Sequence, residues 1–413
     1  MAKSGETNDK KHTKTLWTLC SVPFIMVLGN SMLIPVLPQI MEALNVSLFE
    51  AGLLITAFSG PASISILFAG YLADLYGRKL VLVPALVLYG LGGLTAGAAG
   101  MFLAESYVPI LSARVLQGIG AGGTYQIAMV MVSDLYESSE RSRALGLLES
   151  WNGIGKVVSP LAGSAAALIT WYAPFFVYGG LSLPIALGVW WITTEASYEQ
   201  NHENFKSYIN NLEDILSTKT ASYLTCLLSG LMVLLLLFGV LSYTSDVLET
   251  QYGLGVLMRG LLIAVPVGAM AATSYTVGTV MQKQLSDYLK LAVVTGCALF
   301  STGLLTANFL TARWALLAVL GVLGIATGMV LPALNTLITS AAPEQHRGLT
   351  TAFYGTVRFG GVALGPPLFG ILADISRTTL LLTGSVSAAV VCGIAAWLIQ
   401  VDKMMPSHIL QKN

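Results

Sequence analysis

Hydrophobic runs of about 20 residues recur from one end of this sequence to the other. At a rise of about 1.5 Å per residue, each run is long enough to cross ~30 Å of hydrocarbon as a helix. The runs are continuous rather than alternating, which excludes a transmembrane β-barrel. We therefore expect an all-α membrane protein. The twelve predicted spans are residues 17–38, 49–73, 80–101, 107–132, 143–169, 174–193, 221–244, 257–281, 290–310, 313–338, 348–373 and 379–400.

Charged residues are scarce. Of the 413 residues, 55% are hydrophobic and only 10% are charged, too few to cover the surface of a soluble protein. If the N-terminus lies in the cytoplasm, most lysines and arginines fall on inner segments. The inner residues are Lys3, Lys10, Lys11, Lys14, Arg78, Lys79, Arg141, Arg143, Lys206, Lys219, Lys283, Lys290, Arg347, Lys403 and Lys412, and the outer ones are Arg259, Arg313 and Arg377. This asymmetry predicts a protein of the cell (inner or plasma) membrane with both termini cytoplasmic. The polar residues before Trp17 predict no removed signal peptide.

One extended polar stretch, residues 194–220, divides the spans into two groups of six. Apolar residues recur in it at helical spacing, so part of it is either an amphipathic helix on the inner membrane surface or a solvated tether. Those residues are Tyr208, Ile209, Leu212, Ile215 and Leu216. The predicted organisation is a cytoplasmic tail (1–16), a six-helix bundle (17–193), a cytoplasmic linker (194–220), a second six-helix bundle (221–401) and a cytoplasmic tail (402–413).

An internal repeat supports two related halves. When the fifth predicted span is laid over the eleventh without a gap, charged, small and proline positions coincide. Arg141 meets Arg347, Gly155 meets Gly361, Ser159 meets Gly365 and Pro160 meets Pro366. Repeats of this kind build many secondary transporters, which bind their solute near the membrane midplane.

The strongest local motif is GYLADLYGRK, residues 70–79, where the second span leaves the membrane. It resembles the loop motif G-x-L-a-D-r-x-G-r-k of the major facilitator superfamily. Gly70 allows close helix approach, Gly77 permits a tight turn, and Asp74 can meet a helix end or an arginine. The resemblance implies a gating loop that also contains Arg78 and Lys79. The expected partner of this loop is Asp134, at the end of the fourth span.

Two further elements extend the resemblance. LSARVLQGIGAGG, residues 111–123, resembles the family pattern R-x-x-q-G-x-g-a, in which the arginine is associated with proton transfer. Arg114 and Gln117 form one polar stripe, and a purely structural arginine is the alternative. GKVVSPLAG, residues 155–163, resembles the G-x-x-x-G-P-x-x-G-G motif of the twelve-helix drug/proton antiporter branch. It departs from that motif at Ser159 and Ser164. Its hinge residues are Gly155, Ser159, Pro160 and Gly163, and Gly365 and Pro366 supply a matching hinge in the second half.

The coupling acid is expected in the fifth span. The first span carries Asn30 where many relatives with a proton site carry an acid. The only carboxylate well inside any predicted span is Glu149. Helical spacing places Glu149, Asn152, Lys156 and Ser159 on one face, with Glu149 and Lys156 about 10 Å apart. We expect this face to line a cavity, where Glu149 exchanges protons. The alternative is a structural ion pair between Glu149 and Lys156.

Other polar residues inside spans are expected to line the solute cavity. Well inside the predicted spans lie three cations, Arg114, Lys156 and Arg358, and one anion, Glu149. This excess of positive charge suits an acidic or zwitterionic solute. The expected cavity residues are Asn30, Gln117, Tyr125, Asn152, Tyr243, Asn335, Tyr354 and Arg358.

These features together predict a secondary transporter rather than an enzyme. The sequence has no phosphate-binding loop and no catalytic or metal-binding cluster, so we expect no cofactor and no metal. The zero net charge gives no reason to expect nucleic acid. The expected partners are a small-molecule substrate, protons and the lipid bilayer, and we expect a monomer. The favoured function is proton-coupled export of drugs or small metabolites by alternating access. The alternative is a carrier of one small, possibly anionic, metabolite with the same fold.

Overall fold

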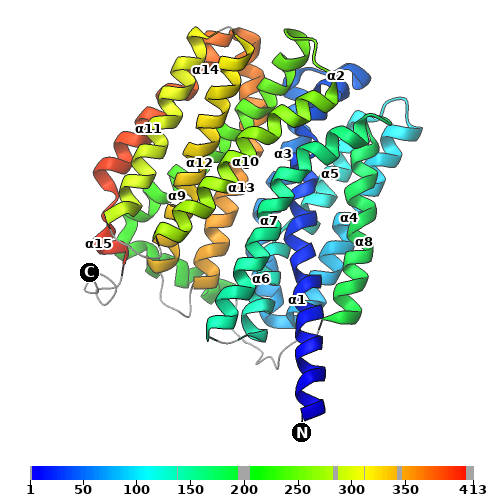
Figure 1. Ribbon diagram of the computed structural model, residues 1–413, viewed down its shortest axis with the longest axis vertical. Helices are drawn as coiled ribbons and strands as arrows, with labels where there is room; N and C mark the ends of the chain where they lie inside the picture. Colours follow the sequence, from blue (N-terminus) through cyan, green and yellow to red (C-terminus); the bar gives the residue numbers. More distant parts are fainter. Residues whose placement is uncertain are drawn as a thin grey trace. The chain divides into compact units, whose positions relative to one another are not determined.

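The computed structural model describes residues 2–136, 138–193, 205–281, 287–310, 312–341 and 347–405, and these residues are almost entirely helical (Figure 1). In chain order the elements are α1 (Ala2–Ser31), the 3₁₀ turn η1 (Ile34–Val36), α2 (Leu37–Leu44), α3 (Leu48–Tyr76), α4 (Arg78–Phe102), α5 (Tyr107–Ala121), α6 (Thr124–Leu135), α7 (Ser138–Ala167), α8 (Ala173–Ile192), α9 (Phe205–Thr250), α10 (Val256–Met281), α11 (Asp287–Phe309), α12 (Arg313–Ala341), α13 (Arg347–Ile375), α14 (Arg377–Leu398) and α15 (Val401–Met404).

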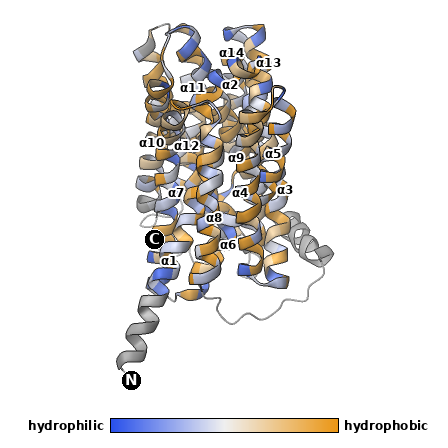
Figure 2. Ribbon diagram, turned by 90° about the vertical axis from the view of Figure 1, so that its right-hand side faces the viewer, coloured by the Kyte–Doolittle hydropathy of each residue, from blue (hydrophilic) through white to orange (hydrophobic). Residues whose placement is uncertain are grey.

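Eleven stretches of the described residues are helical, long and apolar enough to cross a membrane. The remaining predicted span corresponds to α7, which has 30 residues but carries several charged and polar side chains. With α7 included, the arrangement agrees with the expected fold of twelve transmembrane helices. Hydrophobic residues recur along the helices (Figure 2). Many large apolar side chains are exposed, and Trp191 and Trp397 are among the most exposed. Such a surface is suited to lipid.

Two predicted spans are interrupted. The first predicted span, 17–38, is not one helix, because α1 ends at Ser31 and is followed by η1 and α2. Pro35 and Pro38 have no N–H to donate, which ends regular helix here. The fourth predicted span is divided at Gly122 and Gly123 into α5 and α6. Gly123 has a φ of 79°, a left-handed conformation that favours glycine.

The linker prediction falls partly outside the described residues, which omit residues 194–204. From Phe205 onward the backbone is helical and continues without interruption into the seventh span, forming the 46-residue helix α9. Neither a separate surface helix nor a tether is therefore seen at 205–220.

By internal contacts the chain divides into two compact units, residues 1–33 with 57–203 and residues 34–56 with 204–413. Inside the first unit α7 packs on α1, and α4 packs on α5 and α8. Inside the second unit α13 packs on α9, and α12 packs on α10 and α11. The boundary falls within α3, between Thr56 and Ala57, so the first nine residues of α3 belong with the second unit.

Candidate functional site

The first unit contains a fully buried arginine. Arg114 and Gln117 lie three residues apart on one face of α5, and neither is accessible to solvent. One terminal nitrogen of Arg114 donates to the carbonyl oxygen of Gly29 at 2.8 Å and to Gln117 Oε1 at 2.6 Å. The other donates to Asn30 Oδ1 at 2.6 Å. The guanidinium therefore joins α5 to the end of α1 through several charge-assisted hydrogen bonds.

Aromatic side chains surround this guanidinium. The Phe58 ring lies 4.5 Å from Arg114 Cζ, and the Tyr178 hydroxyl lies 3.4 Å from a guanidinium nitrogen. The Tyr89 hydroxyl donates to the carbonyl oxygen of Ile25 at 2.8 Å. The named acceptors are neutral oxygens, so hydrogen bonding and a cation–π contact together offset the cost of burying the charge.

Close helix packing creates this site. A Cβ atom at Gly92 would lie 2.6 Å from the Gln117 backbone nitrogen, and one at Gly118 would overlap the Phe58 carbonyl oxygen. Asn30 Nδ2 donates to Ser59 Oγ at 2.5 Å, which links α1 to α3. Asn30, Arg114 and Gln117 are therefore brought together, and all three are buried. Sequence reasoning missed Phe58, Ser59, Tyr89 and Tyr178, because they come from three other helices and match no motif.

Glu149 is placed differently from its prediction. Its side chain is exposed rather than buried, and its carboxylate accepts a hydrogen bond from the Tyr125 hydroxyl of α6. The four residues predicted to share a face of α7, Glu149, Asn152, Lys156 and Ser159, differ in burial. Asn152 and Ser159 are buried, whereas Lys156 is half-buried. Glu149 and Lys156 lie at the edge of the face that packs inward, because 100° per residue rotates them 60–80° from its centre.

The residues predicted to form a hinge in α7 lie on the face that packs against α1. A Cβ atom at Gly155 would lie 3.2 Å from the Phe24 carbonyl oxygen, and one at Gly163 would lie 2.7 Å from Met32 Cα. Ser159 is buried between these two glycines, and Pro160 follows it inside the helix. These residues bring two helix backbones into contact.

The predicted hinge in the second unit packs in a similar way. A Cβ atom at Gly361 would lie 3.2 Å from Leu231 Cα, and one at Gly365 would lie 3.0 Å from the Gly239 nitrogen. Pro366 follows Gly365 inside α13. The α9–α13 pair therefore repeats the backbone contact of the α1–α7 pair.

The loop motif lies at the junction of α3 and α4. Gly77 has a φ of 98° and stands immediately before α4. Arg78 forms an ion pair with Asp134, so the predicted partner of this loop lies beside it. Gly70 and Asp74 lie in the last two turns of α3, and both are half-buried.

Lys79 joins the same loop to the end of α8. Its Nζ atom donates to the Thr193 carbonyl oxygen at 3.0 Å and lies 5.4 Å from the centre of the Trp190 ring. A cation at a helix C-terminus is favourable because the helix dipole is negative there.

The predicted cavity residues of the second unit do not form one cluster. Tyr354 is buried and Arg358 is half-buried, with its Cζ atom 5.2 Å from the Tyr354 ring. Asn335 is exposed on α12. Tyr243 lines a pocket that it shares with none of these three residues.

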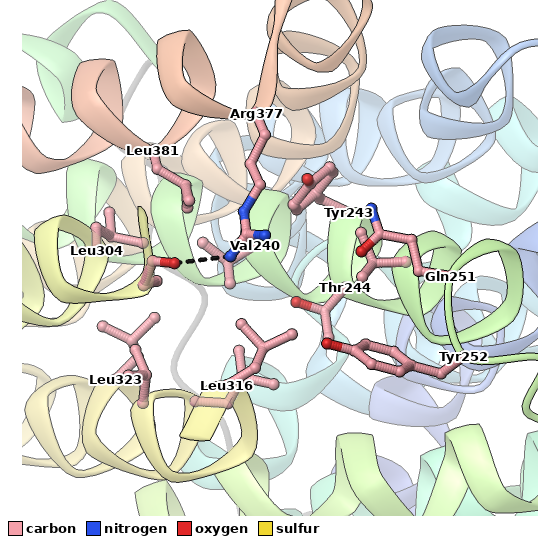
Figure 3. A pocket seen from close by; sticks show the side chains of 14 residues that line it. Val240, Tyr243, Thr244, Gln251, Tyr252, Leu304, Leu316, Leu323, Arg377 and Leu381 are labelled. Atoms are coloured by element: carbon pink, nitrogen blue, oxygen red, sulfur yellow. Dashed lines mark hydrogen bonds between the residues drawn. The ribbon is translucent and has the colours of Figure 1, made fainter. Parts of the chain in front are cut away.

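That pocket lies among α9, α11, α12 and α14 (Figure 3). Tyr243, Thr244, Gln251 and Tyr252 form its polar side, and leucines form the opposite wall. The guanidinium of Arg377 also lines it and donates to the Ala307 carbonyl oxygen at 2.8 Å, as drawn in Figure 3. The cavity measures about 20 Å³, which is enough for roughly one water molecule. It is too small to hold a metabolite as it stands.

The fold and these sites define a class of protein: a multi-span membrane protein in which helix pairs pack by a repeated pattern and polar groups are buried within the bundles. The profile of the Major Facilitator Superfamily matches residues 19–366, which is most of the chain. The chain therefore belongs to the major facilitator superfamily, and it is a transporter rather than an enzyme.

Curated relatives include an exporter and drug-resistance proteins. The chain is 37% identical to the bacillibactin exporter of Bacillus subtilis (strain 168), over 87% of this chain and 90% of that protein. It is 26% identical to multidrug resistance protein 2 of the same organism, over 87% and 88%. It is 23% identical to the quinolone resistance protein NorA of Staphylococcus aureus, over 88% and 90%. These bacterial relatives indicate a transporter of the cell membrane that carries a small molecule.

Solved structures confirm the fold. A bacterial homologue of the human lysosomal transporter Spinster, in an inward-facing and occupied conformation, aligns with a TM-score of 0.74. The alignment covers 95% of this chain and 98% of that one, at 16% identity. The human organic anion transporter MFSD10 (TETRAN) aligns with a TM-score of 0.71 over 93% and 99%, at 15% identity.

Proposed function

We propose that this chain exports bacillibactin or a chemically similar metabolite from the cell in exchange for protons. The observation that carries the proposal is the 37% identity to a bacillibactin exporter across 90% of that protein's length. Relatives named for multidrug resistance and multidrug efflux match at 26% and 25% identity over similar lengths. The higher identity to the bacillibactin exporter favours a dedicated metabolite exporter over a broad drug exporter. A dedicated carrier is the alternative that the sequence left open.

The charges in the middle of the spans support an acidic or zwitterionic substrate. Well inside the predicted spans there are three cations, Arg114, Lys156 and Arg358, but only one carboxylate, Glu149. A positive excess in a low-dielectric region attracts anionic groups, because charge interactions are weakly screened there. In this proposal the substrate is acidic or zwitterionic, and the proton is carried by a separate group.

Glu149 is the proposed proton carrier. Its carboxylate is not covered by packed side chains, and it accepts a hydrogen bond from the Tyr125 hydroxyl. A proton from the outside neutralises Glu149 and favours the inward-open state. The substrate then binds from the cytoplasm and displaces the proton. Asn30 occupies the position where many relatives carry an acid, so Arg114 holds the helices together instead of pairing with a proton-binding group.

The proposed topology follows the distribution of lysine and arginine. Both termini lie in the cytoplasm, the chain acts as a monomer, and residues 17–193 and 221–401 form the two bundles joined by the 194–220 linker. The two bundles provide alternating access.

Broad drug export is the second candidate. It is favoured by the multidrug relatives and by the helix motif from Gly155 to Gly163, which resembles that of drug/proton antiporters. The two candidates differ in substrate, and both predict proton antiport.

The test uses everted membrane vesicles with an acid interior, in which a pH-sensitive dye reports proton efflux. Bacillibactin is added first, followed by a panel of cationic, neutral and anionic drugs. Wild type is compared with Glu149→Gln, and Glu140→Gln is the matched control because Glu140 is an exposed acid on the same helix. Uptake of labelled bacillibactin is measured in parallel, with and without a protonophore.

Bacillibactin should release protons in wild type and Glu140→Gln but not in Glu149→Gln. A response to cationic drugs without a response to bacillibactin would establish broad drug export instead. Uptake of labelled bacillibactin that survives the protonophore would refute proton coupling while leaving the substrate assignment intact.

A further inference from the structure

The second unit contains a carbonyl group that its own helix cannot satisfy. Pro367 lies inside α13 and has no N–H, so the usual helical hydrogen bond to the Ala363 carbonyl oxygen, four residues earlier, is missing. Ala363 is buried. A buried carbonyl without a donor is unfavourable by roughly the cost of a lost hydrogen bond. A donor from outside the helix that bonds to this oxygen removes that penalty.

Thr56 of α3 provides that donor. Its hydroxyl donates to the Ala363 carbonyl oxygen at 2.5 Å. Two glycines allow the approach: a Cβ atom at Gly52 would lie 2.8 Å from the Pro367 nitrogen, and one at Gly370 would lie 2.6 Å from the Phe49 nitrogen. The backbones of α3 and α13 are therefore in contact over two helical turns, with the hydrogen bond at one end.

The same hydroxyl has a second acceptor in its own helix. The carbonyl oxygen of Gly52 lies 3.4 Å from Thr56 Oγ1. If α3 moved away from α13, the hydroxyl would turn toward Gly52, as threonines in helices commonly do. The Ala363 carbonyl oxygen would then be open to water in the gap. Both groups keep a partner after separation, so breaking the contact carries a small penalty.

The position of Thr56 gives this contact a role in movement. Thr56 is the last residue of the segment 34–56 that packs with the second unit, and α3 continues into the first unit from Ala57. Separation of α3 from α13 at this contact would break the Thr56–Ala363 hydrogen bond.

We propose that the Thr56 hydroxyl and the Ala363 carbonyl freed by Pro367 form a releasable latch between α3 and α13, which biases the transporter toward the conformation in this structure. The latch does not depend on the identity of the substrate or on proton coupling. Its function is to stabilise the contact between α3 and α13 while keeping that contact reversible.

The test measures the distance from α13 to α2, the helix that directly precedes α3. Spin labels are attached to cysteines introduced at Glu42, which is exposed on α2, and at Ile375, which is exposed at the end of α13. The distance distribution is measured by electron–electron double resonance in lipid nanodiscs. The native cysteines are replaced by alanine. These are Cys20, Cys226, Cys297 and Cys392.

Thr56→Val keeps the side-chain shape and removes the hydroxyl, whereas the control Thr56→Ser keeps the hydroxyl. Loss of one hydrogen bond of ordinary strength should raise the ratio of separated to closed molecules roughly fivefold in Thr56→Val, and Thr56→Ser should match wild type. Distributions that are identical in all three proteins would overturn the proposal.

Pro367→Ala tests the origin of the latch, because the restored N–H can satisfy the Ala363 carbonyl within α13. In that background Thr56→Val should change the ratio by less than about twofold, since coupled positions are not additive. An undiminished fivefold effect would show that Thr56 acts through something other than the freed carbonyl. Because Pro367→Ala leaves Thr56 intact, its distance distribution can be measured even if Thr56→Val fails to fold.

Discussion

Replacing Arg114 by lysine separates the geometry of the buried guanidinium from its charge. In the structure, one guanidinium nitrogen bonds to Gly29 and Gln117 and the other bonds to Asn30. A lysine has a single terminal nitrogen and cannot reach acceptors on both sides. One or two buried acceptors are then left without this donor, at about 1–3 kcal/mol each. We expect Arg114→Lys to destabilise the protein by about 2–4 kcal/mol.

The assay is the melting temperature of the purified, monodisperse protein in detergent. Arg143→Lys is the matched control, because Arg143 is exposed on α7 and the same exchange there should change stability by no more than about 0.5 kcal/mol. The expected order is wild type and Arg143→Lys together, with Arg114→Lys clearly lower. If Arg114→Lys melted with the control, the buried network would not depend on the planar guanidinium, and our account of the site would be wrong.

Four further changes test three glycine positions and one helix end. Gly163→Ala forces a methyl group against the backbone of α1 and should cost about 1–3 kcal/mol in a melting assay. Gly153→Ala in the same helix meets nothing within 4 Å and should be neutral or stabilising. Gly123→Ala places a side chain at a φ of 79° and should cost about 1 kcal/mol or more, measured in the same way. Lys79→Met removes the bond to the Thr193 carbonyl and should increase hydrogen exchange at the end of α8, whereas unchanged exchange would contradict a capping role.

The sequence was a good guide to the number and length of the helices, because lipid imposes both through hydropathy. It was a poor guide to where helices break. The signals were present: Pro35 and Pro38 remove donors in the first span, and Gly122 and Gly123 stand together in the fourth. A hydropathy pattern cannot detect such breaks, because prolines and glycines in membrane helices are tolerated wherever neighbouring groups satisfy the backbone.

The sites were predictable to different degrees. Arg114, Gln117 and Asn30 were recognised as polar groups inside spans, and they do meet, because a buried charge draws every available acceptor. The direction of Glu149 was not predicted, because a rotation of 60–80° separates the packed face of α7 from its edge and helical spacing alone resolves no finer angle. The partner of Arg78 was predicted only as a loop contact, since the pairing with Asp134 depends on the fold.

The helix pairs show what the repeat preserves. In the first unit Gly163 of α7 packs against Met32 of α1, and at the equivalent point of the second unit the glycine is on the other helix, with Gly239 of α9 packing against Phe369 of α13. Close approach needs one small residue at each crossing, and either helix can supply it. The selected property is therefore the distance between two backbones, not the residue at a given position. This explains why sequence comparison aligns Gly155 with Gly361 and Pro160 with Pro366 but finds no match at the next crossing.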